Sequence, residues 1–486
     1  MTLFKAQFLR KPIIFLVATM LSVSAMAADF NDTLKLANNG DAKAQSDLGW
    51  MYETGNGVSQ DYIKAVEWYL KAASQGDAKA QSDLGWMYQT GKGVSQDYVK
   101  AVEWYVKAAY QGDTFAQYSI GWMYETGKGV SQDYVKAAKW YQWAADLGNT
   151  DAQLSLGYMY SSGDGVDRDY DKAVEWFEWA ANQRVIEAQY NLGLIYEIGE
   201  GGLQDYNKSF KWYREAAKQG NISAQFKIGY MYGVGQGVPQ DYVKAIEWFE
   251  KAANQGDAVS QFNLGIMYSR DEGNSPNYDK AIEWYTKAAN QGNAASQFNL
   301  GVMYETGKYV VQDYDQAVEW YLKAANQGFV KAQFNLGVMY SNGKGVVQDN
   351  SKAYEWYSKA ANQDDAEAQY NLGLIYQKGR GTGQDYIKAV DWYLKSANQD
   401  YAMAKLNLGY MYDTGKGVRQ DYAKAHEWYL KAADQGNAES EFNLGLQYYR
   451  GEGVSQNKAT AKEWFHKSCE NGFEDGCNAY QVFNKE

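Results

Sequence analysis

The chain has 486 residues, a formal net charge of −12, and a composition with 48 Gly, 43 Tyr and 17 Trp but only 3 Pro. An acidic surface repels nucleic acid and anionic lipid, so we expect no nucleic-acid partner. The length would ordinarily indicate about three domains of ~150 residues, but the aromatic content and the regular Gly spacing indicate internal repeats.

The chain begins with the features of a secretory signal. Basic residues precede an apolar run over 13–23, which is too short to span a membrane comfortably, and an Ala-x-Ala cleavage site ends at Ala27. We predict that residues 1–27 are a signal peptide cleaved after Ala27 and that the mature protein is periplasmic or secreted. An uncleaved anchor is the alternative. Cleavage removes three positive charges and takes the net charge from −12 to −15, and no membrane insertion is expected afterwards.

From residue 41 onward the chain repeats with a period of 36 residues. A Gly preceded by Leu or Ile returns twelve times from Gly49 to Gly445, and a Trp returns twelve times from Trp68 to Trp464. Twelve repeats therefore occupy residues 41–472. We predict that residues 28–40 and 473–486 are capping segments, because a stack of repeats needs polar ends.

Each repeat has the pattern of two helices. In repeat one, apolar residues spaced as on one helix face follow Asp41, which predicts a first helix, helix A, over roughly 41–54. Asp61 then caps a second helix, helix B, over roughly 62–75, with an apolar stripe that includes Trp68. No segment alternates polar and apolar residues over strand length, so we expect no sheet.

The turn between the two helices contains Gly55 and Gly57. We interpret it as a reversal of the chain and not as a phosphate-binding loop, which would follow a strand and carry a Lys-Ser or Lys-Thr step. Asp271 and Tyr309 replace glycines in repeats seven and eight, so a different turn shape is predicted there. The recurrent Trp and Tyr side chains are predicted to form the core, because burying one removes roughly 150 to 250 Å² from water.

The repeats resemble the Sel-one-like repeat family, relatives of tetratricopeptide repeats. The resemblance rests on the pattern AxxxLGxxYxxGxGVxxDxxKAxxWYxKAAxxG, which runs from Ala44 to Gly76 and returns along nearly the whole chain. It implies an all-α fold, an α/α superhelical solenoid of twelve 36-residue helix-turn-helix repeats, that acts as an adaptor for other proteins. The family also includes secreted, cysteine-rich bacterial members linked to β-lactam binding.

Two cysteines, Cys469 and Cys477, flank the turn between the last helix B and the C-terminal segment. In an oxidising compartment we predict that they form a disulfide that staples the C-terminal cap. A similar Cys-x7-Cys spacing in the cysteine-rich members of the family supports this pairing.

No constellation of residues indicates catalysis. His426 and His466 are 40 residues apart, and neither belongs to a metal-binding motif. Two Ser-x-x-Lys tetrapeptides, at 341–344 and 455–458, fall in or after the glycine turns, and no Lys-Thr-Gly occurs. We therefore predict that the protein is not an enzyme and needs no cofactor or metal.

Variation between repeats is concentrated on one face of helix A. The residues three before and one after the helix A Gly form pairs such as Ser46/Trp50 and Phe298/Val302. In the first repeats the larger side chain of the pair is the second one, and in later repeats it is generally the first. Packing between helices would conserve total volume in this way, whereas a peptide-binding groove would carry an aromatic stripe. Related solenoids line their concave side with helices A, and we expect recognition there. The candidate partner-binding residues are Trp50, Glu53, Trp86, Gln89, Trp122 and Glu125.

Three functions from different classes remain open. The sequence favours a non-enzymatic periplasmic or secreted scaffold that binds a protein or peptide through the concave face of the solenoid. A protein that binds envelope glycan through exposed Trp and Tyr is the first alternative. A β-lactam-binding or β-lactam-hydrolysing protein, by analogy with the cysteine-rich members alone, is the second.

Overall fold

The computed structural model describes residues 23–270 and 276–483. These residues form 26 α-helices and one short 3₁₀ helix, η1 (Glu200–Gly202), and contain no strand. The all-α fold built from 36-residue helix pairs is thereby confirmed. Two compact parts divide near α12 and α13: one extends to residue 231 and includes 235–239, and the other comprises 232–234 with the residues from 240 onward.

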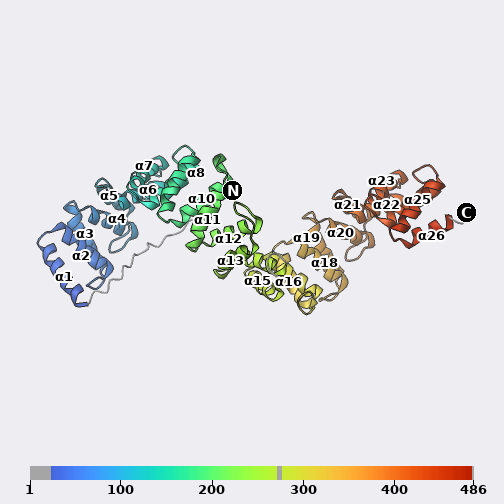
Figure 1. The fold of residues 1–486 in the computed structure, drawn as a ribbon, viewed down its shortest axis with the longest axis horizontal. Helices are drawn as coiled ribbons and strands as arrows, with labels where there is room; N and C mark the ends of the chain where they lie inside the picture. The colour runs from blue at the N-terminus through green and yellow to red at the C-terminus, as the bar shows by residue number, and fades with distance from the viewer. Residues whose placement is uncertain (1–22, 271–275, 484–486) are drawn as a thin grey trace. The chain divides into compact units, whose positions relative to one another are not determined.

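Helices A and B alternate along the chain, and consecutive helices pack side by side within each part (Figure 1). The helices A are α2 (Ala42–Thr54), α4 (Ala78–Thr90), α6 (Thr114–Thr126), α8 (Thr150–Ser162), α10 (Ile186–Ile198), α12 (Ile222–Val234), α14 (Ala258–Ser269), α16 (Ala294–Thr306), α18 (Val330–Asn342), α20 (Ala366–Lys378), α22 (Ala402–Thr414) and α24 (Ala438–Arg450). The helices B are α3 (Tyr62–Ser74), α5 (Tyr98–Ala109), α7 (Tyr134–Asp146), α9 (Tyr170–Asn182), α11 (Tyr206–Lys218), α13 (Tyr242–Asn254), α15 (Tyr278–Asn290), α17 (Tyr314–Asn326), α19 (Asn350–Ala361), α21 (Tyr386–Asn398), α23 (Tyr422–Ala433) and α25 (Lys458–Glu470).

Caps define the ends of the helices as the sequence predicts. In repeat one the Asp41 side chain accepts a hydrogen bond from the backbone N–H of Ala44, and Asp61 accepts one from that of Lys64. Helix α2 ends at Thr54 and is capped by Gly55, whose φ of 76° is left-handed and favours glycine. The turn therefore reverses the chain, and its left-handed backbone explains why Gly55 is a glycine.

Repeat eight keeps the same turn although Tyr309 stands in a glycine position. Tyr309 has a left-handed φ of 72°, and its ring stacks on Tyr278 with centroids 3.3 Å apart. In repeat two, the equivalent Gly93 lies so close to the backbone of Tyr62 that a Cβ would clash with its carbonyl oxygen. The prediction of a different turn shape is therefore wrong for repeat eight, since the backbone there stays left-handed. The replaced glycine of repeat seven, Asp271, lies outside the described residues.

The Gly in the middle of helix A permits close packing of helix B. A Cβ at Gly49 would lie 2.6 Å from the ring of Tyr69, which is fully buried in α3. The same contact joins Gly85 to Tyr105 in the next repeat. Because real Cβ atoms do not approach a ring this closely, the recurrent Leu-Gly or Ile-Gly step marks the crossing point of each helix pair.

Buried glutamines connect successive repeats. Gln81 of α4 donates from Nε2 to the carbonyl oxygen of Ala73 in the preceding helix B, at 3.0 Å. Its Oε1 accepts a hydrogen bond of 2.8 Å from Nε2 of Gln111, in the turn after α5. The bonds recur in other repeats, for example at Gln189 and Gln297. A buried amide with satisfied partners therefore fixes the spacing of three successive helices.

The recurrent Trp of helix B is less buried than predicted. Tyr69 and its equivalents are buried, but Trp68 and eight of its eleven equivalents are only half-buried, the exceptions being Trp212, Trp284 and Trp356. A lysine one turn further along covers the indole, as where Lys71 Nζ lies 3.7 Å from the Trp68 ring centroid. The core prediction is therefore correct for the residue next to the Trp and wrong for most of the Trp side chains, because helix A packs against the adjacent helix face.

This difference in burial predicts unequal costs for two neighbouring substitutions. Phe249→Ala removes a buried ring and should lower the free energy of unfolding by about 3 to 5 kcal/mol. Trp248→Ala removes a half-buried indole and its contact with Lys251, so we expect about 1 to 2 kcal/mol. Chemical denaturation followed by circular dichroism measures both. An equal or larger cost for Trp248→Ala would contradict the observed packing.

Single helices flank the repeats at both ends of the described chain. Helix α1 (Val23–Asn38) packs against α2, and α26 (Glu474–Phe483) packs against α25. A disulfide joins Cys469 to Cys477, with the Cα atoms 4.4 Å apart, across the turn between α25 and α26. Most of the predicted signal peptide lies outside the described residues. Among the helices that the structure describes, none is long and apolar enough to cross a membrane.

Candidate functional site

The three predicted aromatic anchors stand in the same register on three successive helices A. Trp50 of α2 is 40% exposed, whereas Trp86 of α4 and Trp122 of α6 are half-buried. Lys92 and Lys128 of the following turns place their Nζ atoms 4.4 and 4.6 Å from the centroids of these two half-buried indoles. The aromatic row is therefore present on one face, and its first member is the most accessible.

The polar residues predicted to act beside these indoles form hydrogen bonds with buried tyrosines. Glu53 Oε2 accepts a hydrogen bond of 2.6 Å from the hydroxyl of Tyr69, which is buried in helix B. Gln89 and Glu125 accept the equivalent bonds, at 2.7 Å, from the tyrosines of repeats two and three. The three side chains satisfy buried hydroxyl groups, and their contact with a ligand stays a prediction.

Packing explains the first member of each variable pair on helix A. Phe298 lies against the buried Tyr321, with ring centroids 5.8 Å apart, and similar contacts occur in other repeats. Ser46 and Ser82 at this position are buried, and Ser82 Oγ donates to Asp113 Oδ1 at 3.0 Å. Of the two interpretations of these pairs, the structure therefore supports packing for the first member. The groove interpretation stays open for the second.

A cluster of acidic groups lies between repeats one and two. Asp83 of α4 is half-buried, and its Oδ2 atom is buried without a hydrogen-bond partner among the described residues. Burial, and then the charge of Glu53, raise the pKa of Asp83 to about 7. Burial and the charges of Asp83 and Glu53 also raise the pKa of Tyr69. A carboxyl group at Asp83 is therefore largely protonated just below neutral pH.

The sequence patterns did not reveal this cluster, because Glu53 and Asp83 are 30 residues apart in the chain. In repeats five and six the same offset joins Glu197 to Lys227, whose Nζ and Oε1 atoms are 2.8 Å apart. Asn occupies the Asp83 position in seven repeats, as at Asn371, where the amide donates to the carbonyl oxygen of Glu367. A comparison of residues at this offset would have revealed that Glu53 and Asp83 form a like-charge pair.

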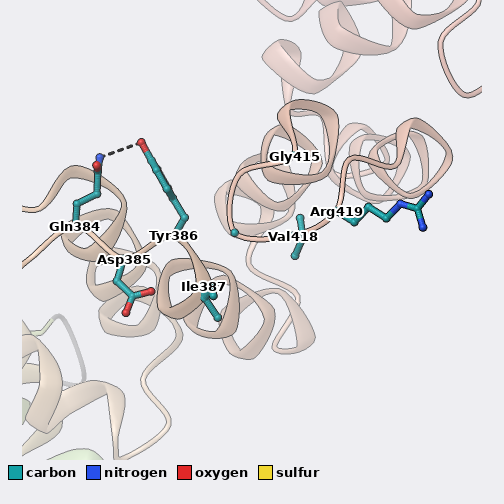
Figure 2. Close-up of a pocket in the computed structure, with 8 residues that line it drawn as sticks. Gln384, Asp385, Tyr386, Ile387, Gly415, Val418 and Arg419 are labelled. Atoms are coloured by element: carbon teal, nitrogen blue, oxygen red, sulfur yellow. Dashed lines mark hydrogen bonds between the residues drawn. The ribbon is translucent and has the colours of Figure 1, made fainter.

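Open pockets occur at equivalent places along the turns. One is lined by residues that include Tyr62, Ile63 and Gly93, and another by residues that include Tyr386 and Ile387. Figure 2 shows the second pocket, where the amide of Gln384 donates to the Tyr386 hydroxyl group at 2.9 Å. Each lining includes a Gln, a Tyr, an exposed Ile and the Asp that caps the helix, Asp61 in one pocket and Asp385 in the other.

The histidines and cysteines do not form a reactive site. His426 Nδ1 lies 2.9 Å from Oε1 of Gln447, and the His466 ring lies 4.4 Å from that of Tyr480. Cys469 is oxidised, so it offers no thiolate to His466. Within residues 23–270 and 276–483, no group of three His, Cys, Asp or Glu side chains could hold a metal ion.

Comparison with known proteins identifies the repeats. The model of the Sel1 repeat matches twelve consecutive segments: 42–77, 78–113, 114–149, 150–185, 186–221, 222–257, 258–293, 294–329, 330–365, 366–401, 402–437 and 438–473. Each segment begins one residue later than the predicted repeats and spans one helix A and one helix B.

Two solved structures are similar over most of their own length. A protective antigen of uropathogenic Escherichia coli strains, which displays an SLR fold, is 35% identical over 92% of this chain and 96% of its own, with a TM-score of 0.73. A Sel1 repeat protein from Oxalobacter formigenes is 31% identical over 63% of this chain and 90% of its own, with a TM-score of 0.52. The search of curated proteins gave no significant match.

Proposed function

Because the chain belongs to the Sel1 repeat family, we propose that it is a non-enzymatic scaffold that binds a protein partner through the exposed face of its helices A. Sel1 repeat proteins are generally interaction scaffolds without catalytic activity. A stack of such repeats presents one extended surface, on which side chains at one register position recur in space.

The aromatic row on successive helices A carries this proposal. Trp50, Trp86 and Trp122 are rigid side chains of large area, and aromatic anchors of this kind dominate the binding energy of protein interfaces. Their neighbours Glu53 and Gln89 are held in place by hydrogen bonds from buried tyrosines, so the surface beside the indoles is ordered before a partner binds. A preordered surface reduces the entropic cost of association.

The proposed location is the periplasm or the cell exterior, on the strength of the predicted signal peptide over 1–27. The net charge of −15 after cleavage at Ala27 favours a partner with a basic or extended segment. The disulfide between Cys469 and Cys477 fits an oxidising compartment.

Site-specific photo-cross-linking tests the position of the partner. Benzoylphenylalanine in place of Trp50 should capture a discrete protein in intact cells, whereas the same group in place of Ile63, an exposed residue of helix B, should not. Once the captured protein is purified, Trp50→Ala should weaken its binding at least about tenfold, because truncation of an anchor costs more than about 1 kcal/mol.

Folding and binding must be measured on the same variants. Trp50→Ala should lower the free energy of unfolding by only about 1 kcal/mol and leave the protein folded, because the indole is 40% exposed, and Val99→Ala, which truncates an exposed side chain of α5, serves as the control. Unchanged affinity of Trp50→Ala for the captured protein would remove the helix A face from the interface.

A further inference from the structure

Most helices B carry a lysine that covers the recurrent indole. In nine repeats a lysine follows the Trp by three residues and places its Nζ atom 3.7 to 4.9 Å from the ring centroid. These lysines are Lys71, Lys107, Lys251, Lys287, Lys323, Lys359, Lys395, Lys431 and Lys467. The chain itself therefore shows that this face of the indole accommodates a cation, held by attraction to the electron-rich ring.

Repeats three and four replace that lysine with a second indole. Trp143 of α7 lies 5.0 Å from Trp140, and Trp179 of α9 lies 4.9 Å from Trp176, both in edge-to-face geometry. Tyr110, at the end of α5, joins the first pair with centroid distances of 5.9 and 6.3 Å to Trp140 and Trp143. These five residues, from the end of α5 and from α7 and α9, form two clusters in the same register of successive repeats, and together we call them the aromatic patch.

The patch is exposed to solvent. Tyr110 is 70% exposed, Trp143 is 49% exposed and Trp179 is 52% exposed. Leu147, which follows α7, is exposed beside the same helix. Large aromatic side chains gathered on a protein surface generally mark an interaction site.

We propose that the aromatic patch binds arginine or lysine side chains of a protein partner. The partner's cations stack on the exposed rings of Trp143 and Trp179, which stand where the other helices B carry their own lysines. Arginine suits this face best, since its planar guanidinium stacks on aromatic rings and is weakly hydrated. This site lies on helices B and is separate from the proposed helix A interface, so it stands without that proposal.

Charge at the Trp179 end of the patch supports a cationic ligand. Asp146 occupies, one repeat later, the register position of Tyr110, which contacts the recurrent Trp140 of the following repeat, and Gln142 donates to the Oδ1 atom of Asp146 at 2.7 Å. Glu175 precedes Trp179 by four residues and shares its helix face. Carboxylates beside open aromatic rings form the usual surroundings of a bound cation.

The Tyr110 end has a different charge. Lys139 precedes Trp143 by four residues, and it replaces the Glu found at this position as Glu67 and Glu103 in repeats one and two. A cation is therefore expected to occupy the Trp179 end first. The Tyr110 end then contributes apolar and stacking area.

Restoring the lysine of the other repeats tests the proposal with little risk to folding. The double variant W143K/W179K gives repeats three and four the residue that nine other repeats carry. The probe is a peptide of three arginines separated by glycines, and its binding to the mature chain is measured by titration calorimetry at low salt. We expect binding at least about tenfold weaker for the variant, because the two exposed rings are lost and the new lysines cover Trp140 and Trp176. A citrulline peptide, neutral but of similar shape, should bind wild type as weakly as the arginine peptide binds the variant.

A charge-matched control separates recognition by the patch from general electrostatics. The variant Asn254→Lys/Asn290→Lys adds the same two charges at exposed ends of helices B, where repeat five already has Lys218. It should bind the arginine peptide nearly as wild type does, and circular dichroism should show that both double variants remain folded. Equal loss in the two double variants, or unchanged binding by W143K/W179K, would overturn the proposal. Patch-dependent binding of cellohexaose without binding of the arginine peptide would overturn it too and assign the patch to sugar.

Discussion

Replacement of Gly301 by Ala should destabilise the protein, although the same change inside a helix normally stabilises it by roughly 1 kcal/mol. A Cβ at Gly301 would lie 2.5 Å from the Tyr321 ring, which is fully buried. The ring cannot retreat without losing the hydrogen bond of 2.6 Å from its hydroxyl group to Glu305. Overpacking of this kind costs about 1 to 3 kcal/mol, so denaturation should show a net loss of about that size.

Gly233 provides a matched control near the end of α12. A Cβ there would approach no heavy atom of the described residues more closely than 3.9 Å. Gly233→Ala should therefore stabilise the protein by a few tenths to about 1 kcal/mol. A double-mutant cycle with Tyr321→Leu should show that most of the cost of Gly301→Ala disappears when the ring is absent. Stabilisation by Gly301→Ala in the wild-type background would refute the close packing.

Asp83→Asn should stabilise the N-terminal repeats at pH 8 by up to about 4 kcal/mol and leave their stability nearly unchanged at pH 4. The pKa of Asp83 is raised to about 7 by burial and by Glu53, whereas the unfolded chain has a value near 3.8. An Asn in this place can donate to a backbone carbonyl oxygen, as Asn371 does with Glu367. The substitution thus replaces a buried acid with a residue that other repeats already accept.

The direction of the pH effect follows from proton binding. Between about pH 4 and pH 7 the folded state holds the Asp83 proton and the unfolded state has released it, so stability falls as pH rises through this window. The free energy of unfolding changes by at most about 1.4 kcal/mol per pH unit through this group, and Asp83→Asn should lack this dependence. Unfolding of both proteins in denaturant at four pH values isolates the Asp83 contribution as their difference.

Asp47 is the equivalent residue of repeat one and is exposed. Asp47→Asn should change stability by less than about 0.5 kcal/mol at every pH, because surface substitutions away from special features have small effects. A difference between wild type and Asp83→Asn that does not grow with pH would show that Asp83 ionises freely in the folded protein.

The sequence by itself determined the features that arise within one helix pair. The interval of 36 residues, the Asp caps at Asp41 and Asp61 and the glycine turn with Gly55 follow from local backbone preferences, so their positions could be read from the residues alone. The all-α fold followed because apolar residues recur with the period of a helix and never with that of a strand. Because the same pattern recurs in all twelve repeats, the interpretation of one helix pair applied to every other pair.

Tertiary structure decided which face of each helix is buried and what meets between repeats. Adjacent apolar residues on helix B, Trp248 and Phe249, cannot be ranked by periodicity, and only the position of helix A shows that the second is buried. The pairing of Glu53 with Asp83 spans 30 residues, and that of Tyr110 with Trp140 also spans 30. Such contacts depend on how one helix pair is stacked on the next, a geometry set by side-chain volume and buried amides and not by local propensity.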